Sequence, residues 1–367
     1  MAPPGISIDV APEDVSFDMK RVVPVSVVEL AAEAKHLPEK FMKSAENRPT
    51  VAHNDYCKEI PVISLKGIDT QSGRESIVAE VKRACEEWGI FQIVDHGIPA
   101  DLMKRMKENT MAFFQLPLEE KVKYATKPGG FPLGYASGSH RADDDILDWR
   151  ELLVHRCLPK AVRETDYKIW PAKPEEYRKI LVEYSDTMNV LVVLLFGLIS
   201  ESLGLPVDYI KNKVGGEEAE QKMVLNYYPQ CPQPDLTLGL RSHTDHGIIA
   251  VLQQENVGGL QAYKEDRDKW VTVEPIPGAL VVNLGDQVQI MSNGKYCSVE
   301  HQAVVNSNDT RLSLVTFANP NAMAEMGPAP ELLSETNPAK YHSYKFKEYL
   351  PIAFSKKTKR VHDALLI

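Results

Sequence analysis

The stretch RSHTDHG, residues 241–247, places two potential metal ligands, His243 and Asp245, two positions apart. Alternate side chains of a β-strand share one face, so this imidazole and carboxylate point the same way, while His246 points to the other face. His301, which opens the strand-like segment HQAVVNS, is the best candidate for a third ligand. Two imidazoles and one carboxylate on one side of an ion are typical of non-haem Fe(II) oxygenases, and they can also hold catalytic zinc. The pattern therefore predicts an iron or zinc site.

The segment RLS adds a second chemical function ten residues after His301. Arg311 and Ser313 share a face of the expected strand. A guanidinium with a neighbouring hydroxyl can grip a carboxylate, and each charge-assisted hydrogen bond contributes about 1.5–3 kcal/mol. A buried arginine is costly without an anion, so its partner is either a ligand carboxylate or an internal Asp or Glu.

Composition limits the class of protein. The chain has 367 residues, 43% of them hydrophobic and 25% charged, which is enough for a large core. A net charge of -9 without a long basic block argues against nucleic acid or an anionic membrane as the main partner, and the basic cluster at 355–360 is typical of a solvated tail. The apolar run at 190–199 is about half the length that spans a bilayer, so we expect a buried helix. Five scattered cysteines without a C-x-x-C pair indicate reduced thiols and a cytoplasmic location.

Helical spacing dominates the chain from about 70 to 215, as in RESIVAEVKRACEEWG and in the segment 175–204, with glycines at 89 and 204 as stop signals. Strand-like pieces at 60–65 and 90–97 interrupt this half. After about 220 come many short segments rich in β-branched and aromatic residues, separated by turn signals: KMVLNYYP, IIAVLQQE, GLQAYK, WVTVEPI, ALVVNLGD, HQAVVNS and RLSLVTFANP. This succession predicts a sandwich or barrel flanked by helices.

These motifs together resemble a known family. H-x-D, a distant His and R-x-S, with WGIFQIVDHG, DWRE, NYYPQCPQPDLTLGL, VGGLQ and NSNDTRLS, resemble the plant 2-oxoglutarate/Fe(II)-dependent dioxygenases over nearly the full length, and most of all flavone synthase I and flavanone 3-hydroxylase. The resemblance implies mixed α and β structure: a double-stranded β-helix (jelly roll) core with a packed N-terminal helical region. We expect a mostly helical region at 1–215, the jelly-roll core at 216–325 and a C-terminal helical extension at 326–367.

By this resemblance, His243, Asp245 and His301 are the catalytic ligands of Fe(II), and 2-oxoglutarate chelates the iron. Arg311 and Ser313 would bind its far carboxylate. Dioxygen is the second co-substrate and ascorbate the expected reductant.

Two residues of NYYP match positions that place the co-substrate in this family, namely Asn226 and Tyr228. Strand alternation allows only one of the two tyrosines to face the site, and we expect Tyr228 rather than Tyr227.

The organic substrate is specified less directly. Phe317 and Asn319 have the same parity as Arg311, and Phe317 could stack on a flat aromatic molecule or simply pack in the core. Phe131 and Tyr135, on a glycine-containing segment, match pocket positions of the resembled family, although a loop tyrosine can also be a lid over the core.

His246 stands where the flavanone enzymes usually have proline, so HTDHG departs from their pattern. We expect a turn or pocket-rim residue that could contact the substrate. His96 is expected to be structural, and Asp148, Trp149 and Arg150 to be first a packing and ion-pair element and only second a part of the pocket wall.

The expected function is 2-oxoglutarate-dependent oxidation of a flavanone such as naringenin, through a ferryl species, with release of succinate and carbon dioxide. We expect desaturation to a flavone, with hydroxylation (3- or 2-) as the close alternative and another hydrophobic plant metabolite as a further one. A non-enzymatic binding module would have lost the triad or R-x-S, and a zinc hydrolase does not explain Arg311 and Ser313. A monomer that binds neither nucleic acid nor membrane is expected.

Overall fold

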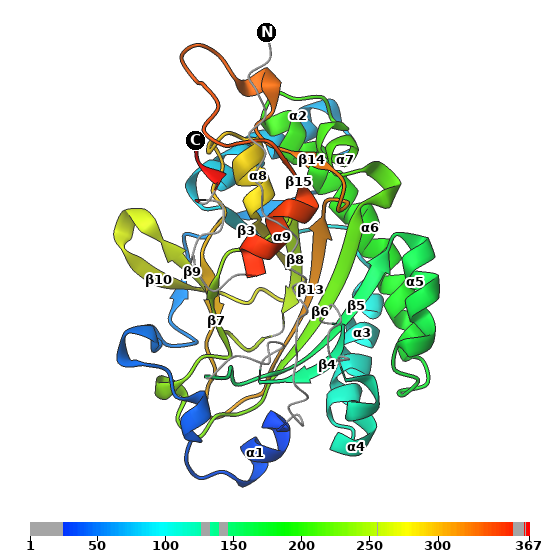
Figure 1. Ribbon diagram of the computed structural model, residues 1–367, viewed down its shortest axis with the longest axis vertical. Helices are drawn as coiled ribbons and strands as arrows, with labels where there is room; N and C mark the ends of the chain where they lie inside the picture. The colour runs from blue at the N-terminus through cyan, green and yellow to red at the C-terminus, as the bar shows by residue number, and fades with distance from the viewer. Residues whose placement is uncertain (1–24, 126–132, 139–145, 255, 355–362, 364) are drawn as a thin grey trace.

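The structure is a computed structural model that describes residues 25–125, 133–138, 146–254, 256–354, 363 and 365–367. Phe131 and the basic cluster at 355–360 lie outside these residues. Two main sheets face each other, and helices cover the outer side of the larger one (Figure 1).

The smaller main sheet has five strands in the order β1-β10-β9-β12-β7. Their bounds are Tyr56–Cys57 (β1), Lys269–Val273 (β10), Leu260–Lys264 (β9), His301–Ala303 (β12) and Leu240–His243 (β7).

The larger sheet has eight strands in the order β2-β3-β11-β8-β13-β6-β5-β4. Their bounds are Val62–Ser64 (β2), Ile90–Val94 (β3), Leu280–Leu284 (β11), Ile249–Gln254 (β8), Arg311–Asn319 (β13), Glu220–Tyr228 (β6), Glu151–Leu158 (β5) and Gly134–Ser137 (β4). A separate pair, Glu325–Met326 (β14) and Tyr344–Lys345 (β15), lies near the C-terminus.

The described helices are Val27–Glu33 (α1), Gln71–Glu87 (α2), Ala100–Phe114 (α3), Leu118–Lys121 (α4), Lys160–Asp166 (α5), Tyr177–Ser202 (α6), Tyr209–Lys213 (α7), Asp286–Met291 (α8) and Phe346–Phe354 (α9). Strand alternation divides the side chains of the larger sheet between two cores. Leu225, Leu312 and Leu314 point outward into the core shared with α2, α3 and α6. Leu252 and Val315 point inward to a second apolar cluster between the two sheets.

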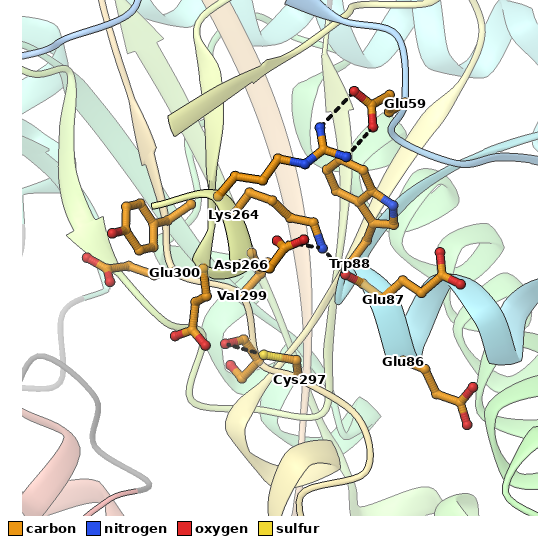
Figure 2. Close-up of a pocket in the computed structure, with 13 residues that line it drawn as sticks. Glu59, Glu86, Glu87, Trp88, Lys264, Asp266, Cys297, Val299 and Glu300 are labelled. Atoms are coloured by element: carbon orange, nitrogen blue, oxygen red, sulfur yellow. Dashed lines mark hydrogen bonds and ion pairs between the residues drawn. The ribbon is translucent and has the colours of Figure 1, made fainter. Parts of the chain in front are cut away.

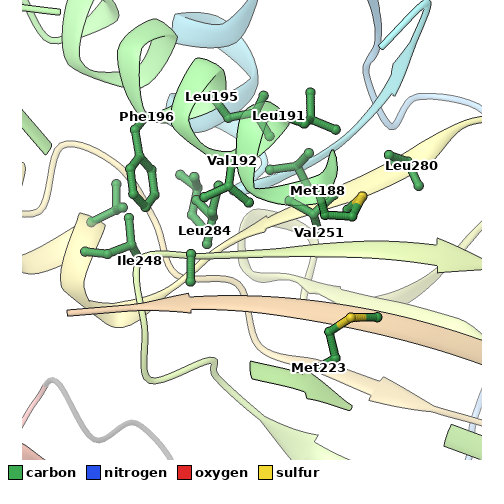
Figure 3. Packing of buried hydrophobic residues seen from close by; sticks show 14 of the residues in the cluster. Met188, Leu191, Val192, Leu195, Phe196, Met223, Ile248, Val251, Leu280 and Leu284 are labelled. Carbon is green, nitrogen blue, oxygen red and sulfur yellow. The ribbon is translucent and has the colours of Figure 1, made fainter. Parts of the chain in front are cut away.

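Helix α6 forms the centre of the outer core. Its apolar side, including Leu191, Leu195 and Phe196, packs on the strands (Figure 3). The helix ends before Gly204, which adopts the φ of 78° that favours glycine. Of the described helices it is the one long and apolar enough to cross a bilayer, yet 56% of that window is buried inside this molecule. The apolar run at 190–199 thus lies in a core helix.

Most expected elements are confirmed, including both long helices and the strands after residue 220. Strand β5, directly after DWR, was missed. Strands β1 to β5, all before residue 216, belong to the two main sheets, so the mostly helical N-terminal region also contributes strands to them.

A buried ion pair fixes the start of β5 to the helical layer. Lys121 Nζ lies 2.7 Å from Glu151 Oε2, and both side chains are at most 2% exposed. The other oxygen, Oε1, accepts a hydrogen bond of 2.8 Å from Ser26, the N-cap of α1. Glu151 therefore joins α1, α4 and β5.

We predict that Lys121→Met lowers the free energy of unfolding by about 3–5 kcal/mol, because it leaves the Glu151 carboxylate buried without its cation. Urea denaturation measures the change. The matched control is Lys104→Met, whose exposed pair with Glu108 should contribute under about 1 kcal/mol. Equal losses in the two variants would contradict the prediction.

Candidate active site

The three expected metal ligands meet between the two sheets. His243 ends β7 and is the register partner of His301, the first residue of β12. His243 is the last residue of β7, and Asp245 lies in the bend beyond it. The two ligands are therefore not the alternate residues of one strand that the sequence pattern predicts. Oδ1 of Asp245 is 3.7 Å from Nε2 of His243 and 3.6 Å from Nε2 of His301. All three donor atoms lie within 4.8 Å of one another.

Backbone carbonyls orient both imidazoles. Nδ1 of His243 is 3.0 Å from the carbonyl oxygen of Arg241, and Nδ1 of His301 is 3.0 Å from that of Val299. A carbonyl only accepts, so each Nδ1 carries the proton and each Nε2 lone pair faces Asp245. In this tautomer the Nε2 atom of each imidazole is free to bind a metal.

Burial makes this cluster a site for a cation. It lowers the pKa of His243 well below its ordinary value, and the neighbouring His301 lowers it further, so His243 is neutral and able to ligate. Burial raises the pKa of Asp245, and the neighbouring His301 and His246 oppose this rise. Oδ2 of Asp245 is buried without a hydrogen-bond partner. A divalent ion would satisfy these groups, so the donor set fits Fe(II).

Arg311 lies on the same inner face at the start of β13 and is 1% exposed. Its Nη2 donates to Gln254 Oε1 at 3.3 Å, its guanidinium carbon is 5.2 Å from the centre of the Tyr228 ring, and its Nε has no hydrogen-bond partner. Within the described part of the chain, no carboxylate lies within ion-pair distance of it. The internal Asp or Glu considered for Arg311 is therefore not found there, and a ligand carboxylate fits the orphaned donor.

Gly259, in the VGGLQ motif, makes room for this arginine. Its φ is +138°, and a Cβ there would lie 2.6 Å from the carbonyl oxygen of Val304 and 3.2 Å from Cδ of Arg311. Only glycine fits this close approach.

Beside Arg311, the inner face of β13 and β6 carries polar side chains. Asn226 is the register partner of Ser313, and its Nδ2 lies 3.5 Å from Ser313 Oγ. Its Oδ1 accepts a 2.6 Å hydrogen bond from Nη1 of Arg150. Tyr228 faces Arg311, whereas Tyr227 stacks on a helix phenylalanine in the outer core. The direct contact of Arg150 with this row was missed, although DWR had been noted.

Further along β13, Phe317 is half-buried against the inner apolar cluster. The Nδ2 of Asn319 donates a hydrogen bond of 3.0 Å to Glu220. The Oδ1 of Asn319 occupies the space beside the Cα of Gly247. The Asn319 amide is thus held between β6 and the metal-ligand loop.

Tyr135 is not brought to this face. Its register partner Leu153 and the adjoining Leu225 both point into the outer core, and Tyr135 lies 6.2 Å from Phe113 of α3 between ring centres. The structure therefore contradicts a pocket position for Tyr135, because the parity of β4 turns its ring toward the helices.

His246 lies in the bend after Asp245, as expected for a turn residue. Its Nδ1 is 3.8 Å from Oδ2 of Asp286, the fully buried first residue of α8. The same Oδ2 accepts hydrogen bonds from Tyr349 of α9 at 2.5 Å and from Thr244 at 3.3 Å. The backbone N–H of Asp286 donates to the carbonyl of Asp245. The C-terminal helix thus supports the metal-ligand loop through Asp286. No signal in the sequence indicates this contact, because the three segments are far apart in the chain.

His96 and Asp148, which are expected to be structural, make contacts of that kind. His96 Nε2 lies 2.8 Å from the carbonyl oxygen of Gly278. Asp148 forms ion pairs with Lys43 at 2.7 Å and with Arg241 at 3.2 Å.

A surface hollow of about 910 Å³ lies between the end of α2 and the β9–β10 hairpin (Figure 2). Acidic side chains predominate in it, and Arg267 pairs there with Glu59 while Lys264 lies over the Trp88 ring. None of the three metal ligands lines it. We therefore place the active site at the triad.

Comparison with known proteins agrees with this geometry. Residues 219–320 match the 2OG-Fe(II) oxygenase superfamily, and residues 60–173 match the non-haem dioxygenase in morphine synthesis N-terminal family. The chain is 46% identical to a naringenin,2-oxoglutarate 3-dioxygenase of Matthiola incana over 83% of this chain and 84% of that protein. It is 45% identical to a flavone synthase of Petroselinum crispum over 82% and 81%, respectively. The chain therefore belongs to the 2OG-Fe(II) oxygenase superfamily.

A solved structure gives the same result. The crystal structure of JOX2 in complex with 2OG, Fe and JA matches with a TM-score of 0.85 and 34% identity, covering 95% of this chain and 99% of that one. The expected jelly-roll core with an N-terminal helical region is confirmed. The protein is an Fe(II)- and 2-oxoglutarate-dependent dioxygenase with its iron site at His243, Asp245 and His301.

We predict that Tyr349→Phe weakens Fe(II) binding about tenfold or more, because Asp286 loses a buried hydrogen bond that supports the ligand loop. Thermal unfolding with and without Fe(II) under anaerobic conditions measures the stabilisation by metal. The control is Tyr167→Phe, which removes a hydroxyl from an exposed ring. A metal-induced rise in Tm equal to that of the wild type would count against this role.

Proposed function

We propose that this dioxygenase oxidises a flavanone such as naringenin, with 2-oxoglutarate held by Arg311 and Ser313. One observation carries the proposal: the buried guanidinium of Arg311 has an orphaned donor and no described carboxylate partner, on the same inner face as the iron ligands. A dicarboxylate that chelates iron at one end would supply the missing anion at the other.

The chain's own groups would position this co-substrate. Arg311 donates to the far carboxylate, with the Ser313 hydroxyl on the same strand face. Asn226 and Tyr228, their register partners on β6, complete the polar end of the inner face. Bound Fe(II) with 2-oxoglutarate and dioxygen supplies the oxidising chemistry, releasing succinate and carbon dioxide. The protein binds, orients and excludes water.

The organic substrate would lie on the apolar middle of the inner face. Val315 and Leu252 are buried there, and Phe317 offers an aromatic surface. His246 remains a candidate for the rim of this pocket, and Asn319 for its edge. The flavanone-acting relatives support the substrate class.

Desaturation to a flavone remains our prediction for the product. Hydroxylation is the second candidate, because the similar proteins include 3-dioxygenases of naringenin as well as a flavone synthase. The two reactions differ in whether the oxidised substrate loses a second hydrogen or gains a hydroxyl. We further propose that the protein is cytoplasmic, in line with its five free cysteines, and that it is a monomer.

The product mass tests this function. Purified protein is incubated with naringenin, Fe(II), ascorbate and 2-oxoglutarate, with Asp245→Ala as the inactive control. We expect loss of two hydrogens. Gain of one oxygen would establish the hydroxylase instead. If naringenin is unchanged while succinate is still released, the flavanone assignment is refuted but the dioxygenase assignment is not.

We also predict that Arg311→Lys raises the KM for 2-oxoglutarate by about 10- to 150-fold, since the loss of a bidentate charge-assisted contact costs about 1.5–3 kcal/mol. Steady-state succinate release measures it. The control is Arg105→Lys on the exposed side of α3. A KM within twofold of the wild-type value would show that the far carboxylate binds elsewhere.

A further inference from the structure

Arg150 is a second buried arginine at the polar end of the inner face. It directly precedes β5 and is 4% exposed. It has the same parity as Leu152, the register partner of Asn226. Since Glu151 is opposite Tyr227, the register sets Arg150 at the level of Tyr228.

The hydrogen bond from Arg150 determines how the Asn226 amide lies. Arg150 Nη1 is 2.6 Å from Oδ1 of Asn226. A guanidinium can only donate, so the amide oxygen must face Arg150 and the NH₂ group must face the other way, where Ser313 Oγ lies at 3.5 Å. One chain of contacts thus crosses β5, β6 and β13.

The charge of Arg150 also lacks an anion. Its Nε is buried without a hydrogen-bond partner, and across the described residues no carboxylate is within ion-pair distance of it. The two acidic residues close to it in sequence are paired with other cations: Glu151 with Lys121, and Asp148 with Lys43 and Arg241. Two buried guanidiniums, Arg150 and Arg311, therefore flank Tyr228 without a carboxylate partner among the described residues, at the end of the inner face where the far carboxylate of 2-oxoglutarate is proposed to bind.

We propose that Arg150 is a positioning residue for 2-oxoglutarate: it holds the Asn226 amide with its NH₂ group toward the co-substrate and adds a second positive charge at the end of the inner face where the far carboxylate binds. This inference rests on the proposed binding of 2-oxoglutarate at Arg311. It accounts for the burial of an arginine in DWR, because the contact to Asn226 and the ligand charge offset its desolvation.

Equilibrium binding of 2-oxoglutarate to the anaerobic Fe(II) protein tests the proposal without turnover. The visible charge-transfer band that forms on chelation gives the Kd. We expect Arg150→Met to raise the Kd at least tenfold, Arg150→Lys to recover part of the affinity, and kcat at saturating 2-oxoglutarate to change much less than KM. The matched control is Arg105→Met, which removes a surface arginine and should leave the Kd within twofold of the wild-type value.

A purely structural role for Arg150 would lower Tm and kcat while leaving the Kd of the folded fraction unchanged, and that result overturns the inference. If Arg150→Met does not fold, Arg150→Lys decides in the same way, because an unchanged Kd also overturns it. Arg311→Lys separates the two hypotheses. If it weakens binding while both Arg150 variants bind normally, only this inference fails. If Arg311→Lys also binds normally, the proposed co-substrate site itself is wrong.

Discussion

The register of β12 against β7 is the constraint on which the site depends. It sets His301 directly opposite His243 and brings residues 58 positions apart in sequence within reach of one ion. Asp245 completes the triad from the bend after β7, where the backbone is held by α8 and the C-terminal helix. A slip of one residue in this pairing would turn a ligand to the opposite face of the sheet.

The inner faces of the sheets carry buried charge that the described residues do not balance. Asp245 has an orphaned oxygen, and Arg311 and Arg150 have orphaned nitrogens. Such groups destabilise the protein alone, because burial penalises each charged form. A dication at the triad and the proposed dicarboxylate at the arginines would supply the missing partners, which would link ligand binding to stability. By contrast, the buried Lys121–Glu151 pair on the outer side is complete and serves only the fold.

Strand parity explains both the successes and the main error of the sequence-based expectations. Along β13 it correctly separates Arg311, Ser313 and Phe317 from the outward-facing leucines. For Tyr135 the strand itself had not been recognised, so its parity was unknown, and the ring lies in the outer core. The contact of Arg150 was missed for the same reason, since β5 had not been identified and DWR could not be placed beside Asn226.

The sequence by itself determined the metal-ligand types, the family and most strands, because these depend on residue chemistry and on short-range spacing. Only the tertiary structure decided which faces meet. The contacts of Arg150 with Asn226, of Tyr349 with Asp286 and of Glu220 with Asn319 join segments 63 to 99 positions apart. No local period encodes such pairs, because they arise from the register and packing of strands and helices distant in the chain.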